Sequence, residues 1–366
     1  MAAPELSLDR EERPAVRPAP AGDYLPALDG LRAIAILFVL AGHLTHLPMI
    51  PGGFGVTLFF FISGLLITRL LLVELDRRGG VDLPRFYVRR LLRLAPALVG
   101  MVLIVAAVAA LRGGEVKGAE VFSAIFYISN YYRIFIDYAL PFAVLWSLSV
   151  EEHYYLAYPA LLPWLMRSGR PLLILAVACG VALIWRAVLM SVIHPPANYT
   201  NMATDTRFDS ILFGAMFSIW QARRPNLAQT SWLVSPWVVA GSLVTLLACF
   251  LVRTDFLRET VRYTLQGLAF IPLVAAVVFN QTWPLYRAAR KVLGAAPLVF
   301  VGRLSYSLYL WHYPCIFAVK ALAPGMGFVA SVLVSLGLSV AAALLSYFAL
   351  ERSFLALRRR FGSHAV

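Results

Sequence analysis

Long, nearly uninterrupted runs of apolar residues recur along the whole chain and constrain its fold more than any other feature. The runs lie at 31–49, 54–73, 91–111, 144–166, 171–193, 207–222, 232–252, 262–280, 297–320 and 326–350. A helix of about 20 residues crosses the ~30 Å hydrocarbon core of a bilayer, and in lipid only helices or closed barrels keep every backbone polar group paired. The sequence therefore predicts an all-α fold, a polytopic transmembrane helical bundle of about ten spans.

Composition excludes the soluble alternatives. Hydrophobic residues make up 60% of the chain and charged residues 14%, against about 45–50% and about 25% in soluble domains. The net charge of +13 would suggest nucleic acid in a soluble protein, but basic loops on one side of a membrane explain it, so no nucleic-acid partner is expected. Cys179, Cys249 and Cys315 lie far apart in apolar runs. They lack the spacing of metal ligands, and no metal is predicted.

Basic residues concentrate on the cytoplasmic side of membrane proteins, and this bias orients the chain. The aromatic segment 119–136, which contains Asn130 and Arg133, is barely long enough to cross. Loops can be assigned to the inside or outside by starting from the N-terminus or from the basic C-terminus. The two assignments agree only if segment 119–136 stays at the outer interface. The predicted inside loops and tails then hold 21 Lys and Arg, the outside loops hold six, and both termini are cytoplasmic.

The chain divides into three regions. Residues 1–27 are charged and Pro-rich, which predicts a disordered cytoplasmic tail. Residues 28–352 form the transmembrane domain, and residues 353–366 form a short basic cytoplasmic tail.

Ionisable residues inside predicted spans need a reason, because burying a charge in lipid is costly. Arg32 and His43 share the first span, eleven positions apart, which brings them to within ~20° of one helix face and about 16 Å apart along the axis. This pattern places a cation at the cytoplasmic entry and a titratable imidazole deeper in the membrane. The alternative is a snorkelling arginine and a hydrogen-bonded core histidine.

Two adjacent carboxylates, Glu151 and Glu152, lie near the outer end of the fourth span. They point about 100° apart on a helix, so one can face a cavity while the other reaches the headgroups. A carboxylate facing His43 would orient the imidazole and stabilise its cationic form. The alternative is a pair that complements the helix dipole.

Arg90 and Arg93 open the third span at positions i and i+3, which share a helix face. Two guanidinium groups at this spacing suit a phosphate or pyrophosphate. The alternative is a topology-determining cluster that contacts lipid headgroups. Other polar residues assigned to substrate binding are Arg207, Asp209, Ser305, Tyr306, Trp311 and His312.

Six segments of the chain form a recognisable set. They are Leu28-Asp29-Gly30-Leu31-Arg32-Ala33 leading to Gly42-His43, Gly53-Phe54-Gly55-Val56 through Phe59-Phe60-Phe61-Ile62-Ser63-Gly64, Phe86-Tyr87-Val88-Arg89-Arg90-Leu91-Leu92-Arg93-Leu94, Trp146-Ser147-Leu148-Ser149-Val150-Glu151-Glu152, Arg207-Phe208-Asp209 with Gly214, and Gly302-Arg303-Leu304-Ser305-Tyr306-Ser307-Leu308-Tyr309-Leu310-Trp311-His312. In this order and on this topology, the chain resembles the acyltransferase-3 family of bacterial integral-membrane O-acyltransferases over nearly all of residues 24–352.

The resemblance implies roles for several of these residues. An Arg separated by ten residues from a His is a signature of the family, and Arg32 and His43 match it, the His being the catalytic residue. The pair matching Arg90 and Arg93 is implicated in binding the acyl donor, and the Glu matching Glu151 is regarded as essential. Members move acetyl or other short acyl groups, from acyl-CoA, onto hydroxyls of surface polysaccharides, lipid-linked sugars or macrolides.

The chain departs from the family pattern at three places. Thr57 stands where the family usually has Asp, and His153 follows Glu152 where Gln is usual. Glu351-Arg352-Ser353 replaces the usual Glu-x-Pro. Some members pass the acyl group to an additional C-terminal hydrolase-like domain; this sequence shows none, so we expect the membrane domain to complete the transfer.

We therefore expect an O-acyltransferase of the bacterial cytoplasmic (inner) membrane, surrounded by membrane lipids. It would move an acetyl or other short acyl group from acyl-CoA, a co-substrate rather than a cofactor, to a carbohydrate or lipid-linked sugar hydroxyl. His43 would act as general base with Glu151 orienting it, and Arg32 would help Arg90 and Arg93 hold the donor. Three alternatives stay open: His43 as a transient acyl carrier, a macrolide or other secondary metabolite as acceptor, and a proton-coupled transporter without chemistry.

Overall fold

The computed structural model describes residues 24–45, 52–224, 232–252, 254–279 and 283–354. Every regular element in these ranges is a helix, as the all-α prediction required. Most of the predicted tails, 1–27 and 353–366, lies outside the described residues. The described part of the first tail is partly helical, because α1 begins at Pro26, two residues before the predicted boundary.

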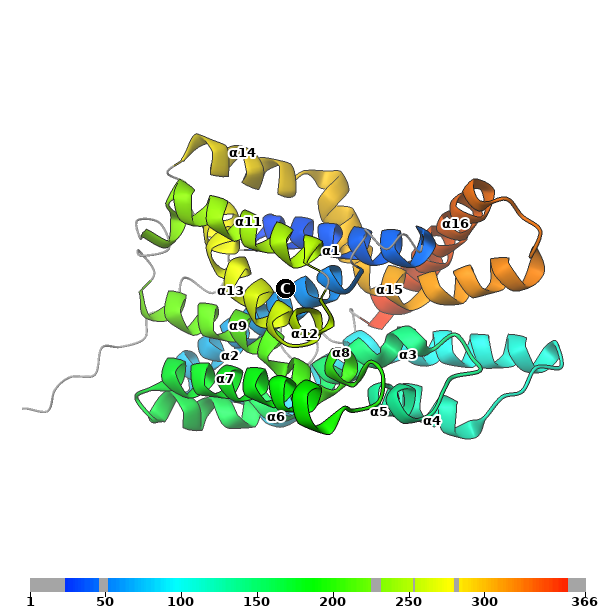
Figure 1. The fold of residues 1–366 in the computed structure, drawn as a ribbon, viewed down its shortest axis with the longest axis horizontal. Helices are drawn as coiled ribbons and strands as arrows, with labels where there is room; N and C mark the ends of the chain where they lie inside the picture. Colours follow the sequence, from blue (N-terminus) through cyan, green and yellow to red (C-terminus); the bar gives the residue numbers. More distant parts are fainter. Residues whose placement is uncertain (1–23, 46–51, 225–231, 253, 280–282, 355–366) are drawn as a thin grey trace, which may run out of the picture.

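The described part of each of the ten predicted apolar stretches falls mainly on one helix (Figure 1). These helices are α1 (Pro26–Thr45), α2 (Gly52–Arg78), α3 (Leu83–Leu111), α6 (Trp146–Arg167), α7 (Pro171–Val188), α9 (Thr204–Arg223), α11 (Pro236–Leu251), α13 (Val261–Val274), α15 (Ala296–Leu322) and α16 (Phe328–Ser346). π-Helical turns extend α7, α13 and α16 through Leu189–Ile193, Ala275–Phe279 and Tyr347–Glu351. The shorter helices are α4 (Gly118–Ile125), α5 (Ser129–Phe135), α8 (Tyr199–Met202), α12 (Asp255–Glu259) and α14 (Pro284–Leu293).

Six helices in the described ranges are long and apolar enough to cross a membrane: α1, α2, α3, α7, α13 and α16, the last three with their π-turns. A seventh crossing results if α14 and α15, bent by 55° against each other, count as one span. The chain is thus a multi-pass membrane protein. Charged residues make α6 and α9 more polar, and α11 has only 16 residues, so ten crossings and the orientation of the termini remain predictions.

Segment 119–136 is not one continuous helix. It forms α4 and α5, of eight and seven residues, separated by Tyr127 with a φ of 56°. Neither helix approaches the ~20 residues that a crossing needs. The buried Glu120 accepts hydrogen bonds from the backbone N–H groups of Ala139 and Leu140, at 2.8 and 3.0 Å, and so ties the following loop to α4.

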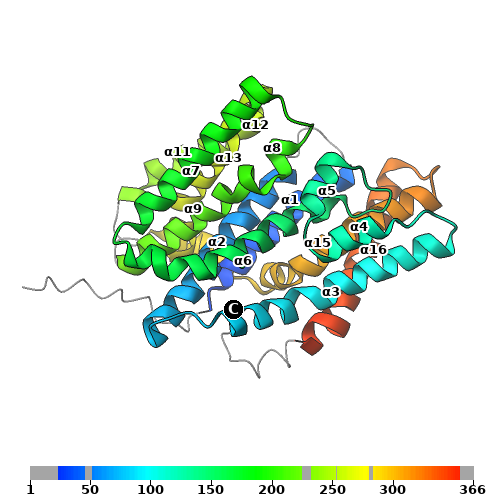
Figure 2. The same ribbon diagram turned by 90° about the horizontal axis from the view of Figure 1, so that it is seen from below.

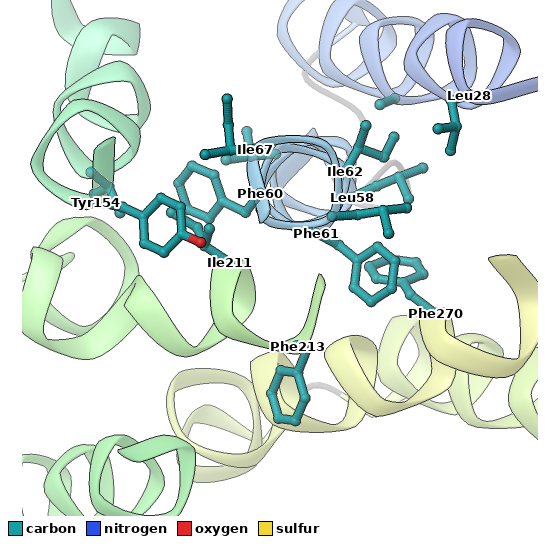
Figure 3. Packing of buried hydrophobic residues seen from close by; sticks show 14 of the residues in the cluster. Leu28, Leu58, Phe60, Phe61, Ile62, Ile67, Tyr154, Ile211, Phe213 and Phe270 are labelled. Carbon is teal, nitrogen blue, oxygen red and sulfur yellow. The ribbon is translucent and has the colours of Figure 1, made fainter. Parts of the chain in front are cut away.

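Helix α2 forms the centre of the bundle. It is the most enclosed of the candidate spans, with 72% of its apolar window buried. Helices α7, α9, α11 and α13 gather on one side of it, and α3, α15 and α16 on the other (Figure 2). Seen along its axis, α2 directs Phe60 toward Tyr154 of α6 and Phe61 toward Phe270 of α13 (Figure 3).

Glycines let the helix backbones touch at two contacts. A Cβ on Gly214 of α9 would lie 1.9 Å from the carbonyl oxygen of Phe61, and one on Gly64 of α2 would lie 1.9 Å from that of Ile211. A Cβ on Gly302 of α15 would lie 1.9 Å from the carbonyl oxygen of Asp29 in α1. Small residues at helix contacts are the usual route to close packing in lipid, where no hydrophobic force drives helices together.

We predict that Gly214→Ala severely destabilises the protein, because its new methyl group has no space and both contacting backbones must move apart. Overpacking typically costs about 1–3 kcal/mol even where only side chains must shift. Thermal melting in detergent, followed by size-exclusion chromatography, measures the loss. The matched control is Gly180→Ala in α7, where no atom lies within 4 Å of the new Cβ; equal melting temperatures for both variants would refute the packing argument.

Candidate active site

A cavity of about 90 Å³ lies between α1, α2, α3, α6 and α15. This is room for several water molecules or a small acyl group. Its polar lining residues are Arg32, Ser63, Arg90, Arg93, Ser147, Glu151, Tyr155, Ser305, Tyr306 and Tyr309. Apolar residues, most of them from α2, complete the wall. Five segments that are distant in sequence therefore bring three arginines and one carboxylate to a single chamber.

Two α15 residues expected in the site, Ser305 and Tyr306, line this cavity. The Nε and Nη2 atoms of Arg32 donate hydrogen bonds to Ser305 Oγ at 3.3 and 3.1 Å. Tyr306 donates to the carbonyl oxygen of Leu94 at 2.7 Å, which holds α15 against α3. The two bonds to Ser305 hold the guanidinium of Arg32 at the cavity wall.

Arg90 and Arg93 both face the cavity, as their i, i+3 spacing requires. The Arg90 guanidinium stacks on the Tyr155 ring, with 3.6 Å between its Cζ and the ring centroid. Its Nε is buried and, within the described part of the chain, has no hydrogen-bond acceptor. A buried guanidinium N–H without an acceptor is costly, and an anion in the cavity would satisfy it.

Glu151 is the carboxylate of the chamber. It accepts a hydrogen bond from Ser63 Oγ at 2.8 Å and lies within electrostatic range of Arg32, Arg90 and Arg93. The three arginines therefore outnumber the single carboxylate on the cavity wall. Glu152 is not among the lining residues of this chamber, so the two adjacent carboxylates have different surroundings, as the ~100° turn per residue implies.

His43 lies further along α1 and contacts α15. Its Nδ1 is 3.1 Å from Nε2 of His312, and the two rings have centroids 5.1 Å apart. The Tyr309 ring lies 5.5 Å from that of His312 and also lines the cavity. The histidine pair therefore adjoins the chamber at Tyr309, although neither histidine is part of its lining.

Glu151 was expected to orient the His43 imidazole. In the structure, the Nδ1 of His43 is hydrogen-bonded to Nε2 of His312. Glu151 accepts its hydrogen bond from Ser63. His312 was expected to bind substrate, but it is fully buried against His43. The direct action of Glu151 on the imidazole stays a prediction.

Three other residues assigned to substrate binding lie away from the cavity. Arg207 is fully buried and donates to Thr57 Oγ1 and to the backbone and side-chain oxygens of Asn201, each at 3.0 Å. Asp209 forms a buried ion pair with Arg186, at 2.8 Å. Trp311 has a buried indole N–H and does not line the chamber. Asp209 thus has an internal counter-ion, whereas Arg207 has acceptors for its Nη atoms while its buried Nε has none within the described residues. Their assignment to substrate binding stays a prediction.

The residues at or beside the three departures from the family pattern have defined contacts. Thr57 receives the hydrogen bond from Arg207 and donates to the carbonyl oxygen of Gly53 at 3.0 Å. Glu351 accepts a hydrogen bond from Ser307 of α15 and lies within electrostatic range of Arg32 and Arg93. The Nδ1 of His153 is hydrogen-bonded to the hydroxyl oxygen of Thr204, at 2.7 Å.

Sequence reasoning missed four polar lining residues: Ser63, Ser147, Tyr155 and Tyr309. Ser147 and Tyr155 are four positions before and after Glu151, so helical spacing would have placed them on its face. Tyr309 is three positions before His312. The sequence contains no comparable signal for Ser63, because its partner Glu151 lies on another helix.

Comparisons with known proteins add independent evidence. A family model described as an acyltransferase domain matches residues 25–351. The peptidoglycan O-acetyltransferase OatA of Listeria monocytogenes is 33% identical over 313 residues, covering 80% of this chain and 49% of that protein. The O-acetyltransferase OatA of Staphylococcus aureus is 33% identical over 315 residues, covering 81% and 51%. The chain spans about half the length of these relatives, and no solved structure matches it significantly.

We predict that Asp209→Asn destabilises the fold rather than weakening substrate binding, because it leaves the buried Arg186 without its counter-ion. Losing one partner of a buried pair costs about 3–5 kcal/mol, whereas replacing both by apolar residues is often tolerated. Melting temperatures should fall for Asp209→Asn and recover in the double variant Arg186→Met with Asp209→Leu. The control is Asp76→Asn, which makes the same change at an exposed aspartate of α2. An Asp209→Asn variant that melts like the parent but has a raised KM would support substrate binding instead.

Proposed function

Because the chain belongs to the acyltransferase family whose domain model covers residues 25–351, we propose that it is a membrane O-acyltransferase. It moves an acetyl or other short acyl group from acyl-CoA to a hydroxyl of a carbohydrate. The observation that carries this proposal is the gathering of Arg32, Arg90 and Arg93 in one cavity that adjoins the half-buried imidazole of His43 through Tyr309 and His312. The names of two relatives, both O-acetyltransferases, support the reaction class.

The donor is proposed from the charge of the cavity. Acyl-CoA carries phosphate groups, and arginine pairs with phosphate through several parallel hydrogen bonds. The unsatisfied Nε of Arg90 and the three arginines on the cavity wall both favour an anionic ligand. The predicted topology places Arg90 and Arg93 near the cytoplasmic side, where acyl-CoA is available.

His43 is proposed as the general base. Arg32 and His43 share the α1 face that packs on α15, about 16 Å apart along the helix axis. The acyl end of a donor held at the arginines would extend past Tyr309 toward the imidazole. There the imidazole removes the acceptor hydroxyl proton, the oxygen attacks the thioester carbonyl, the C–S bond breaks, and the proton passes to the departing thiolate. A transient acyl group on His43 is the variant of this path that single-turnover kinetics would reveal.

The acceptor is proposed from the relatives. The Listeria protein is named for action on peptidoglycan, which is a carbohydrate polymer outside the cytoplasmic membrane. We therefore propose a glycan hydroxyl that reaches His43 from the outer side, and location in the bacterial inner membrane. Access from that side fits His43, which lies toward the end of α1 opposite the arginine cluster.

We predict that His43→Ala lowers acyl transfer by about 10²–10⁴-fold, the usual contribution of general-base catalysis. The protein is purified in lipid nanodiscs with acetyl-CoA and soluble peptidoglycan fragments; free thiol and acetylated glycan are measured together. His43→Gln should behave like His43→Ala. Full activity in either variant would exclude His43 as base or acyl carrier. Passage of substrate across sealed vesicles without thiol release would instead identify a transporter.

We predict that Arg90→Gln raises the KM for acetyl-CoA by about 10–100-fold, because a hydrogen bond to a charged group contributes about 1.5–3 kcal/mol. The value of kcat should change much less. The control is Arg112→Gln, which alters an exposed arginine outside the cavity. An unchanged KM would show that the cavity does not hold the phosphates of the donor.

A further inference from the structure

His312 of α15 lies between His43 and the backbone of its own helix. Its Nε2 is 3.1 Å from the Nδ1 of His43. Its Nδ1 is 2.7 Å from the carbonyl oxygen of Tyr309 and 3.2 Å from that of Leu308. The side chain is 0% exposed. Both ring nitrogens of His312 therefore have hydrogen-bond partners of known position.

These contacts determine which nitrogens carry hydrogen. A carbonyl oxygen only accepts, so Nδ1 of His312 must be the protonated nitrogen. A neutral imidazole has one N–H, which leaves Nε2 of His312 as an acceptor. The Nδ1 of His43 must then donate to it, and a neutral His43 keeps its lone pair on Nε2.

The neutral form of His312 is the one that its surroundings favour. Within the residues that the structure describes, its polar and ring contacts are two backbone carbonyls, His43 and the rings of Tyr309 and Tyr313. None of these is a carboxylate, and a buried cation without a counter-ion is costly. A doubly protonated His312 would also force the Nδ1 of His43 to accept, which would remove the basic Nε2.

We propose that His312 is a positioning residue that fixes the tautomer and the ring orientation of His43, so that Nε2 of His43 is the atom that takes the acceptor proton. This assignment rests on the proposed function for the identity of the reaction. It adds a second histidine to the mechanism and names the reacting atom. When His43 becomes cationic, its Nδ1–H bond to His312 becomes charge-assisted and therefore stronger.

Packing of α1 on α15 makes this arrangement rigid. The two helices run in the same direction, with Asp29 against Gly302, Arg32 against Ser305 and His43 against His312. The His43 ring is also held edge-on by Tyr313, with ring centroids 5.7 Å apart. The ring geometry is thus set by the same helix pair that holds Arg32 at the cavity.

The kinetic test compares His312→Gln with His312→Leu. The Gln carbonyl oxygen can occupy the place of Nε2 and accept from His43, whereas Leu has similar bulk and no acceptor. We expect His312→Leu to lower kcat by about 10²–10³-fold, with an unchanged KM for acetyl-CoA, because only the contribution of the base is lost. His312→Gln should retain activity within about tenfold of the parent, which corresponds to ~1.4 kcal/mol. His153→Gln, which alters a histidine bonded to Thr204, is the control.

Two outcomes would overturn the positioning role. One is equal loss of activity in the Gln and Leu variants when both melt like the parent, which would leave His312 with a packing role alone. The other is a raised KM for the donor in His312→Leu without loss of kcat, which would place His312 in substrate binding.

The tautomer is tested separately on the intact parent protein. Solid-state NMR of ¹⁵N-histidine-labelled protein in lipid bilayers distinguishes protonated from unprotonated ring nitrogens, and His43→Gln assigns the His43 signals. We expect His43 protonated at Nδ1 in the parent and at Nε2 in His312→Leu. Protonation at Nε2 in the parent would refute the inference. Because this readout needs no substrate, it distinguishes failure of the tautomer assignment from failure of the proposed reaction.

Discussion

The contact between the backbones of α1 and α15 is the interaction on which the site depends. Gly302 lets Asp29 approach so closely that a Cβ there would lie 1.9 Å from a carbonyl oxygen. With the helices parallel and in this register, Arg32 meets Ser305 at one level and His43 meets His312 at another. Two layers of the site are therefore built by one helix pair, and a shift of either helix would disrupt both.

Arg186 and Arg90 differ in how completely other groups of the protein satisfy their guanidinium groups. Arg186 donates hydrogen bonds to Asp209, Thr264 and the carbonyls of Thr206 and Thr260, and is completely enclosed. Such a satisfied cation stabilises packing and has little left to offer a ligand. Arg90 faces a cavity, stacks on Tyr155 and keeps an N–H without an acceptor. The unsatisfied N–H of Arg90, together with its place on the cavity wall, is the physical reason for proposing an anionic donor in the chamber.

The sequence predicted the helices well and the pairings among polar residues poorly. The described part of each of the ten apolar stretches is mainly helical, and the ambiguous segment 119–136 forms two helices too short to cross. Spacing along one helix correctly placed Arg90 with Arg93. It could not show that Asp209 pairs with Arg186, that Arg207 meets Thr57, or that His312 rather than Glu151 contacts the His43 Nδ1. Each of these pairs joins different helices, and no local periodicity reports which faces meet.

By itself the sequence determined that this chain is a helical membrane protein, because apolar runs of spanning length have no other stable solution in lipid. It also determined which helix faces carry ionisable groups, since 3.6 residues per turn relates positions within one helix. The tertiary structure alone decided which of those groups share a chamber and which neutralise one another. That choice depends on close approach of glycine-bearing backbones and on the satisfaction of each buried donor, and both arise only when the helices pack together.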